Sequence, residues 1–248
     1  MLGYYKYIRL WFLLCVVVFF YACGKKSSCI KNAGKQTTEV RPISFNFSKI
    51  EVKDNINLVL IQDSLSIMKI EGGENLLPYV KAEVSNNMLS ISNGNKCNFL
   101  RSYNNPITVY LSVTNIEEIY YTGKGSISNT DVLNLNDFII DVKNGTGSVA
   151  LTLNANKISV LSHTGSTDFT LLGTTNDLYV YTGSNAWLYL SNLLANKVHV
   201  NTSGTGDVFV TPLNELLIEL TSLGNIHYSG SPALIISTHS GKGKIIKN

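Results

Sequence analysis

The chain has 248 residues and a net charge of +3, from 20 Lys+Arg against 17 Asp+Glu. The positive charge lies in the first 41 residues, because from Pro42 onward 13 basic residues stand against 16 acidic ones. A mildly acidic folded part excludes a nucleic-acid-binding protein, which needs a basic stripe on its folded surface. The four cysteines show no metal-ligand spacing and no cofactor motif is present, so we predict neither a metal nor a cofactor.

Residues 1–22 are predicted to be a secretory signal peptide. Lys6 and Arg9 precede LWFLLCVVVFFYA, residues 10–22, which is apolar throughout. Such a run fits a signal core of about 7–15 apolar residues and is too short for the ~20 that a spanning helix needs. It ends in FYAC, which resembles a lipobox, so we predict that Cys23 is lipidated. An ordinary secretory signal and a retained membrane helix are the alternatives.

Residues 23–41 are predicted to form a flexible tether after the lipidated cysteine, because SSCIKNAGKQTT is polar and small. An exported chain permits a disulfide between Cys29 and Cys97, although the place of Cys29 in the tether leaves the pairing open. Lys25 and Lys26 follow shortly after Cys23. Acidic residues at these positions would favour export to the cell surface, and they are missing. We therefore expect an anchor in the outer membrane of a Gram-negative bacterium, on the periplasmic side.

Residues 42–115 alternate between apolar and polar positions, as in NLVLIQ (57–62) and ITVY (107–110). Alternation with a period of two predicts β-strands. The pairs Gly72-Gly73 and Asn93-Gly94 mark turns between them. We predict irregular strands here that cap the open end of the structure that follows.

Residues 116–248 repeat about every twenty residues, which is typical of stacked coils. The repeats are TGKGSI (122–127), NGTGSVAL (144–151), TGSTDFTL (164–171), TGSNAWLYL (182–190), SGTGDVFV (203–210), SLGNIHY (222–228) and SGKGKII (240–246). The second-glycine position of these motifs falls at Gly125, Gly147, Thr167, Asn185, Gly206, Gly224 and Gly243. Apolar residues two and four positions later predict a strand whose inner face includes Trp187 and Tyr189.

Each coil is therefore predicted to be a strand, a glycine corner, a second strand and an asparagine-rich corner. Glycine is expected at these corners because a corner requires either a positive φ or the close approach of two backbones. We predict an all-β fold, a β-solenoid with coils of about twenty residues, with an antiparallel β-sandwich as the alternative. A phosphate-binding loop is excluded because Val208-Phe209-Val210, rather than a helix, follows Gly206.

The chain resembles the bacterial head-GIN-domain family, a group of Bacteroidetes-type lipoproteins described as auto-transporter adhesins. The resemblance rests on NLVLIQDS, EGGENLLPYVKAEV, NMLSIS, the G-x-G repeats, HYSGSP (227–232) and SGKGKIIK. It covers nearly all of the chain after the leader. It implies a right-handed β-helix-like fold, export and lipid attachment, and it transfers no catalytic motif.

Aromatic residues provide the candidate binding face. If Trp187 and Tyr189 point inward, alternation leaves Tyr179 and Tyr181 outward, beside His199 and Asn201 of the next coil. Exposed tyrosines on a flat sheet can stack on sugar rings or meet a protein. The alternative is that cross-strand aromatic pairs only stabilise the sheet.

Two acids, Asp168 and Asp207, occupy equivalent positions two coils apart. At ~4.8 Å per coil they would lie roughly 10 Å apart, near the spacing of the carboxylates in inverting glycosidases. We prefer a turn role, because Ser126, Ser148 and Asn225 fill the same position. The four histidines show no ligand spacing.

Three functions remain open. We prefer a non-enzymatic, lipid-anchored envelope protein that binds a glycan, a lipid or a protein. A polysaccharide-acting enzyme on the same scaffold and a self-assembling structural module are the alternatives. The sequence leaves the oligomeric state undetermined.

Overall fold

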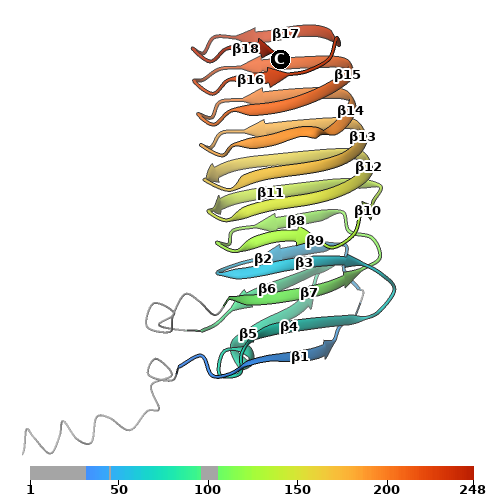
Figure 1. Cartoon of the computed structure of the whole chain (residues 1–248), viewed down its shortest axis with the longest axis vertical. Coiled ribbons are helices and arrows are strands. Elements are labelled where there is room, and N and C mark those ends of the chain that lie inside the picture. Colours follow the sequence, from blue (N-terminus) through green and yellow to red (C-terminus); the bar gives the residue numbers. More distant parts are fainter. Residues whose placement is uncertain (1–31, 45, 96–105) are drawn as a thin grey trace, which may run out of the picture.

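The computed structural model describes residues 32–44, 46–95 and 106–248. Its 18 strands belong to one continuous sheet. Figure 1 shows the strands stacked as a column of coils, with the N-terminal coils at one end and the C-terminal coils at the other. The predicted β-solenoid is therefore confirmed, and the β-sandwich alternative is wrong. The lipidation of Cys23 and a Cys29–Cys97 bond concern residues outside the described ones.

The C-terminal coils are built from parallel strands that lie on two sides of this one continuous sheet. We call the strands before each glycine corner the first sheet and those after it the second sheet. The long strands start on the second sheet, pass the asparagine corner and continue on the first sheet of the next coil. The strands are β8 (Glu118–Tyr121), β9 (Ser126–Asn129), β10 (Leu133–Asn134), β11 (Asp137–Gly145), β12 (Ser148–Gly165), β13 (Asp168–Thr182), β14 (Leu188–Thr202), β15 (Val208–Leu220), β16 (Ile226–Tyr228), β17 (Ala233–His239) and β18 (Ile245–Lys247).

The core consists of aligned columns of apolar side chains, because parallel in-register pairing stacks equivalent residues of successive coils. One column of the first sheet is fully buried: Ile119, Ile140, Val160, Val180, Val200 and Ile218. A matching column of the second sheet runs through Ile127, Val149, Phe169, Leu188, Val208 and Ile226. Burial of each such side chain contributes about 1.5–3 kcal/mol to folding.

The N-terminal strands are threaded out of sequence order. They are β1 (Gln36–Pro42), β2 (Lys49–Val52), β3 (Ile56–Gln62), β4 (Ile67–Gly73), the 3₁₀ turn η1 (Leu77–Tyr79), β5 (Val80–Ser85), β6 (Met88–Asn93) and β7 (Ile107–Val113). Strand β2 pairs in parallel with both β6 and β8, and β3 pairs in parallel with both β7 and β9. The coil β2–β3 therefore lies between two coils that both follow it in the chain.

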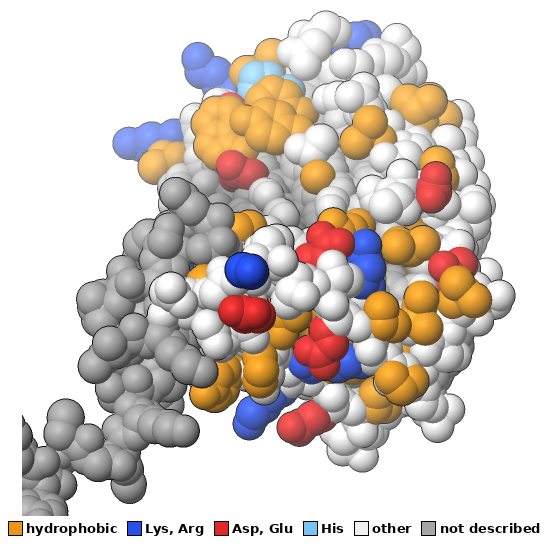
Figure 2. All heavy atoms as spheres, turned by 60° about the horizontal axis from the view of Figure 1, so that its bottom comes forward, with side chains coloured by type: hydrophobic (Ala, Val, Ile, Leu, Met, Phe, Trp, Pro, Cys, Tyr) orange, Lys and Arg blue, Asp and Glu red, His pale blue; other side chains and the backbone are white. Residues whose placement is uncertain are grey.

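Antiparallel strands lie at the N-terminal end of the column. Strand β4 runs antiparallel to β7, β1 runs antiparallel to β4, and β5 runs antiparallel to β6. Figure 2 shows this end with hydrophobic, acidic and basic side chains interspersed. The mixture is typical of a solvated cap that discourages edge-to-edge pairing.

The predicted flexible tether extends too far along the chain. Strand β1 spans Gln36–Pro42 and pairs with β4, and Ala33 is buried against Gly73. Because this stretch is polar, its composition does not reveal the strand β1, whose only partner among the described strands is β4. Residues 23–31 lie outside the described part of the chain.

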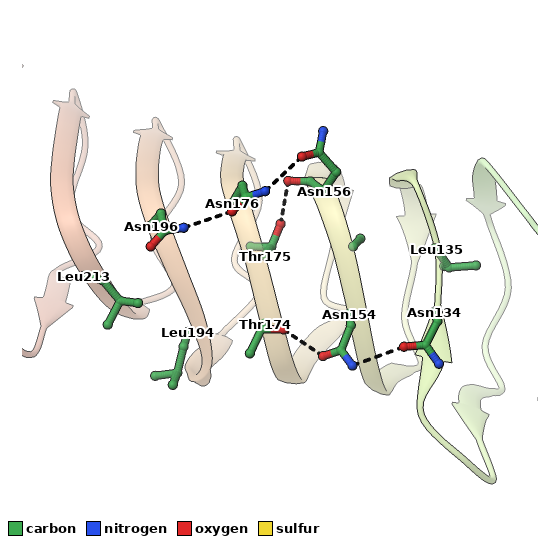
Figure 3. A pocket seen from close by; sticks show the side chains of 11 residues that line it. Asn134, Leu135, Asn154, Asn156, Thr174, Thr175, Asn176, Leu194, Asn196 and Leu213 are labelled. Atoms are coloured by element: carbon green, nitrogen blue, oxygen red, sulfur yellow. Dashed lines mark hydrogen bonds between the residues drawn. The ribbon is translucent and has the colours of Figure 1, made fainter.

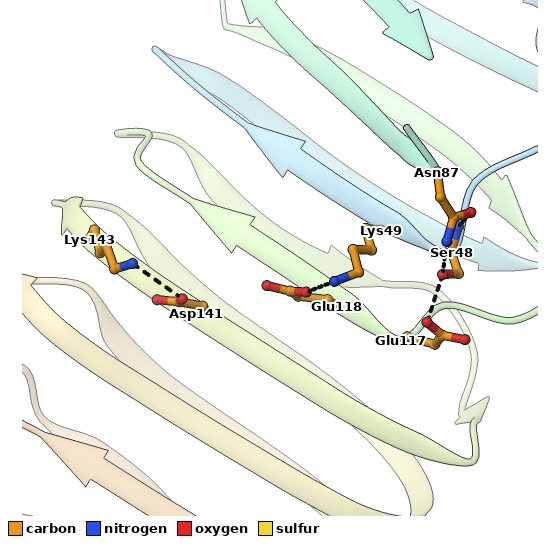
Figure 4. A network of polar contacts seen from close by, with 7 residues as sticks. All are labelled: Ser48, Lys49, Asn87, Glu117, Glu118, Asp141 and Lys143. Atoms are coloured by element: carbon orange, nitrogen blue, oxygen red, sulfur yellow. Dashed lines mark hydrogen bonds and ion pairs between the residues drawn. The ribbon is translucent and has the colours of Figure 1, made fainter. Parts of the chain in front are cut away.

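Polar contacts fix the threaded coil in its place (Figure 4). The ammonium group of Lys49 in β2 lies 2.7 Å from the Oε2 atom of Glu118 in β8. Just before β2, the Ser48 hydroxyl donates to Glu117 at 2.7 Å and accepts from the Asn87 amide at 2.8 Å. These contacts join three segments that are adjacent in space but not in sequence.

The corner glycines allow close approach of successive coils. The five that the repeat singled out are Gly125, Gly147, Gly206, Gly224 and Gly243, and none is among the glycines with positive φ. A Cβ atom on Gly206 would overlap the carbonyl oxygen of Ala186, and one on Gly147 would overlap that of Gly125. Of the two predicted reasons for glycine, the structure selects the steric one.

Candidate functional site

The predicted binding face lies together on the outer surface of the first sheet. Register pairs Tyr179 with His199 and Tyr181 with Asn201. All four side chains are half-buried. The Tyr179 ring meets the His199 ring at a centroid distance of 5.1 Å and an angle of 63°. This face therefore presents ring edges and polar atoms, rather than two fully exposed tyrosine rings.

Glu219 in β15 organises the same face, and the sequence analysis missed it. Its Oε1 atom lies 2.8 Å from Nε2 of His199, and its Oε2 atom accepts a hydrogen bond from Asn201 at 3.1 Å. Burial raises the pKa of Tyr179, and the Glu219 carboxylate adds to this rise. The Tyr179 hydroxyl is thus kept protonated and able to donate. The sequence signal for Glu219 was its position in the repeat, since the register pairs it with Asn201 of the preceding coil.

A groove of about 330 Å³ opens beside Tyr179 and His199. Besides these two, it is lined by Lys157, Asp177, Leu178, Lys197, Val198, Glu215 and Leu217. Register places Lys157, Asp177, Lys197 and Glu215 in one column, so that charges of opposite sign alternate from coil to coil. The groove therefore combines an apolar floor, aromatic edges and charges of both signs.

A larger hollow, of about 500 Å³, follows the asparagine corners (Figure 3). Asn176 donates to Asn156 at 3.0 Å and accepts from Asn196 at 2.9 Å. A second ladder joins Asn134, Asn154 and Thr174. Because these amides are engaged with one another, we assign this hollow to corner stabilisation, and we prefer the groove beside Tyr179 as a ligand site.

The predicted inward orientation of Trp187 and Tyr189 is wrong. Their side chains are 42% and 46% exposed, whereas Ala186 and Leu188 are fully buried. The corner Thr182–Ala186 holds one residue more than the alignment of motifs allowed, so Ala186, and not Asn185, occupies the second-glycine position. A slip of one residue exchanges the two faces of a strand. Leu188 then pairs with Phe169 and Val208 in the core column.

The same slip concealed an aromatic row on the outer face of the second sheet. Trp187 and Tyr189 both stack against Phe209 of the next coil, and Phe209 stacks against His227. Tyr189, Phe209 and His227 occupy equivalent positions of successive coils, and Trp187 lies two residues before Tyr189. The sequence signal was present, but the alternation was read one residue out of phase.

The two acids have the predicted turn role. The Oδ1 atom of Asp168 accepts from the backbone amide of Trp187 at 2.9 Å, and that of Asp207 accepts from Asn225 at 2.8 Å. Burial raises the pKa of Asp207, but hydrogen bonds from Asn225 and His227 outweigh it and hold the pKa below the ordinary 3.8. A carboxylate that stays ionised is unsuited to general-acid work at neutral pH.

Three of the histidines face acidic side chains, and the fourth bonds a carbonyl group. His163 lies 3.3 Å from Asp141, and His227 lies 3.2 Å from Asp207. Nε2 of His239 lies 2.9 Å from the carbonyl oxygen of Gly243. Among the described residues no group of three or more His, Cys, Asp or Glu could hold a metal ion. No helix in the described part is long and apolar enough to cross a membrane.

A comparison with known protein families shows to which family the chain belongs. Residues 46–232 match the family described as "Putative auto-transporter adhesin, head GIN domain". The chain belongs to this family. The head GIN match spans the N-terminal coils and most of the repeats, so both parts described above belong to it. No curated protein sequence matches the chain.

Solved structures share the head GIN fold. A "putative adhesin" from Bacteroides fragilis is 22% identical with a TM-score of 0.75, over 86% of this chain and 97% of that one. A "putative lipid binding protein" from Parabacteroides distasonis is 20% identical with a TM-score of 0.62, over 88% and 99%. A "putative adhesin" from Parabacteroides merdae is 18% identical with a TM-score of 0.65, over 88% and 98%. At these identities the likeness establishes the fold alone.

Proposed function

We propose that this chain is a non-enzymatic binding protein of the bacterial envelope, anchored by a lipid on Cys23. In this proposal Tyr179, Tyr181, His199 and Asn201 contact the ligand, which is a glycan, a lipid or a protein. The lipid anchor holds the solenoid at the outer membrane, with the periplasmic side favoured by Lys25 and Lys26. The names of the family and of the solved structures, adhesins and a lipid-binding protein, support a binding role.

The groove beside Tyr179 and His199 is the observation that carries the proposal. Its volume of about 330 Å³ lies at the lower end of the range for small-molecule sites. Its polar groups include the Tyr179 hydroxyl, the His199 imidazole, two lysines and the carboxylates of Asp177 and Glu215. Such a set can orient a polar ligand above an apolar floor.

The test is a binding panel with residues 32–248. This part folds as a unit, because its described residues form one continuous sheet and one core. Envelope polysaccharides, lipid vesicles and envelope protein extracts are each assayed for binding and for released product. We expect binding without product, weakened about tenfold by Tyr179→Ala or Tyr181→Ala. An unchanged affinity in both variants would exclude this face.

The enzymatic alternative rests on Asp168 and Asp207, whose carboxylates are engaged by backbone amides. If a polysaccharide is hydrolysed, the variants Asp168→Asn and Asp207→Asn test whether these acids catalyse the hydrolysis. Loss of hydrolysis in these variants would replace our proposal by an enzyme. Hydrolysis that is unchanged in both would rule out these acids as its catalysts.

Self-assembly is a second candidate, favoured by the C-terminal end of the solenoid. Leu234 and Ile236 continue core columns that are fully buried in earlier coils, yet they are 41% and 49% exposed. In the described structure β17 and β18 each pair on one side only. An unpaired strand with exposed aliphatic residues can join another chain.

A further inference from the structure

The aromatic row forms a step on the outer face of the second sheet. Trp187 and Tyr189 project from the same coil, with ring planes only 23° apart and centroids 6.2 Å apart. Phe209 lies against both, with interplanar angles of 20° and 14°. His227 continues the stack at a centroid distance of 4.4 Å. On the C-terminal side, therefore, the faces of Trp187 and Tyr189 are covered.

The opposite side of the two rings is open. In the column that holds Tyr189, the preceding coils contribute only the small residues Thr170, Ala150 and Ser128. These side chains form a low floor below the rings. The high exposure of Trp187 and Tyr189, 42% and 46%, persists although Phe209 covers one side. Two rings with nearly parallel planes thus face a strip of sheet that carries only small side chains.

Polar groups border this open face. The Asp168 carboxylate is held one coil below Trp187 by its 2.9 Å hydrogen bond from the Trp187 amide, which occupies only the Oδ1 atom. The exposed Thr170 hydroxyl stands on the floor below Tyr189. The strand segments that flank the step, residues 126–129, 148–153 and 168–173, contain no Lys or Arg. The border therefore accepts hydrogen bonds from hydroxyl groups and repels anions.

We propose that this step, formed by Trp187 and Tyr189 above Thr170, binds a pyranose ring of a neutral glycan. The apolar face of the sugar stacks on the two rings, and its hydroxyl groups donate to Asp168 and bond to Thr170. A uronic acid or phosphorylated sugar is disfavoured by the unneutralised carboxylate. This inference rests on the binding role proposed above, but it assigns that role a different surface and a single ligand class.

The fluorescence of Trp187 can report ligand binding at the step. The chain holds two tryptophans, Trp11 in the leader and Trp187, so Trp187 is the only one in residues 32–248. We would titrate this part with laminarin, dextran and yeast mannan as neutral probes and with polygalacturonate as the acidic probe. Fluorescence of Trp187 and affinity electrophoresis are read in parallel. We expect at least one neutral probe to change the emission and retard the protein, and polygalacturonate to do neither.

Variants locate the site. Trp187→Ala removes half of the step, and Thr170→Arg fills the floor with a guanidinium group that itself stacks on the open ring face. We expect each to weaken binding at least tenfold in affinity electrophoresis, with unchanged far-ultraviolet circular dichroism. Because Thr170 is exposed, its variant keeps the core intact. The matched control is Tyr79→Ala, which removes a ring that is 43% exposed and lies outside both proposed surfaces, and it should leave the affinity for the neutral probe unchanged.

The outcomes separate this inference from the proposed function. Glycan binding that survives Thr170→Arg but is lost in Tyr179→Ala overturns the step and supports the groove. Stronger binding of polygalacturonate than of any neutral probe also overturns it. Absence of binding to all neutral probes overturns it too, while lipid or protein binding in the wider panel would leave the proposed function standing.

Discussion

Single residues at the glycine corners determine how closely the coils stack. A Cβ atom on Gly206 would collide with the carbonyl oxygen of Ala186 in the preceding coil. Gly206→Ala therefore forces two backbones apart, and we expect it to lower the free energy of unfolding by about 1–3 kcal/mol. Urea denaturation followed by circular dichroism measures this change.

Gly183 offers a matched control for this prediction. It lies in the preceding corner, is exposed, and would place a Cβ atom no closer than 3.2 Å to any neighbouring atom. Gly183→Ala should change the stability by much less than Gly206→Ala. Equal destabilisation in the two variants would contradict close approach of the backbones as its cause.

The Asp207 carboxylate makes the stability depend on pH. Its pKa in the folded state lies below the ordinary 3.8, because Asn225 and His227 bond the ionised form. The unfolded state therefore binds the proton first as the pH falls. The stabilisation is complete well above pH ~4 and is lost as the pH drops through the folded-state value.

Asp207→Asn should accordingly flatten the decline of the unfolding free energy between about pH 5 and pH 2. The measurement is urea denaturation at a series of pH values. A decline as steep in Asp207→Asn as in the unaltered protein would contradict the role given to Asp207.

At the scale of the element, the asparagine ladder joins corners that strand pairing alone would leave irregular. Asn176 bonds to Asn156 on one side and to Asn196 on the other. Asn176→Ala breaks both bonds, and at about 0.5–1.5 kcal/mol each we expect a loss of about 1–3 kcal/mol in unfolding free energy. Thermal or urea unfolding gives the value.

The exposed Asn192 in β14 is a suitable comparison, since it lies near the same corner but outside the ladder. Asn192→Ala should cost no more than about 0.5 kcal/mol, as is usual for a surface substitution. A similar loss in the two variants would mean that asparagine stabilises the corner by its own turn preference rather than through the ladder.

At the scale of the whole molecule, the two ends of the solenoid differ. Antiparallel strands cap the N-terminal end, whereas β17 exposes Leu234 and Ile236 at the other. If this end joins a second copy, Ile236→Lys should shift the sedimentation of residues 32–248 from dimer to monomer at tens of micromolar. Lys242, Lys244 and Lys247 in the last coil repel their counterparts, so dimerisation should strengthen as salt screens them. A monomer at every concentration and salt would exclude the self-assembly candidate.

The sequence by itself determined the class of fold, because an apolar position that recurs with a period of two inside a twenty-residue repeat permits little except stacked coils. It also located the corner glycines and placed Tyr179 beside His199, since both follow from the repeat alone. Which residues of a coil point inward could not be read from the sequence. A single extra residue before Ala186 turns Trp187 and Tyr189 outward, although the repeat had predicted that they point inward. Only the packed structure reveals that Leu188, rather than its neighbour Trp187, fills the core position.

The tertiary structure also decided the order of the N-terminal coils. Local alternation predicts that β2 and β3 are strands, but their parallel partners β6, β7, β8 and β9 lie far away in the sequence, and no local signal names them. Glu219 beside His199 and the row that joins Trp187 to Phe209 do lie in columns of the repeat, but placing them required the register and phase that the folded coils reveal. Strands are specified by local side-chain periodicity, whereas surfaces arise from register between distant segments, which only the folded chain brings together.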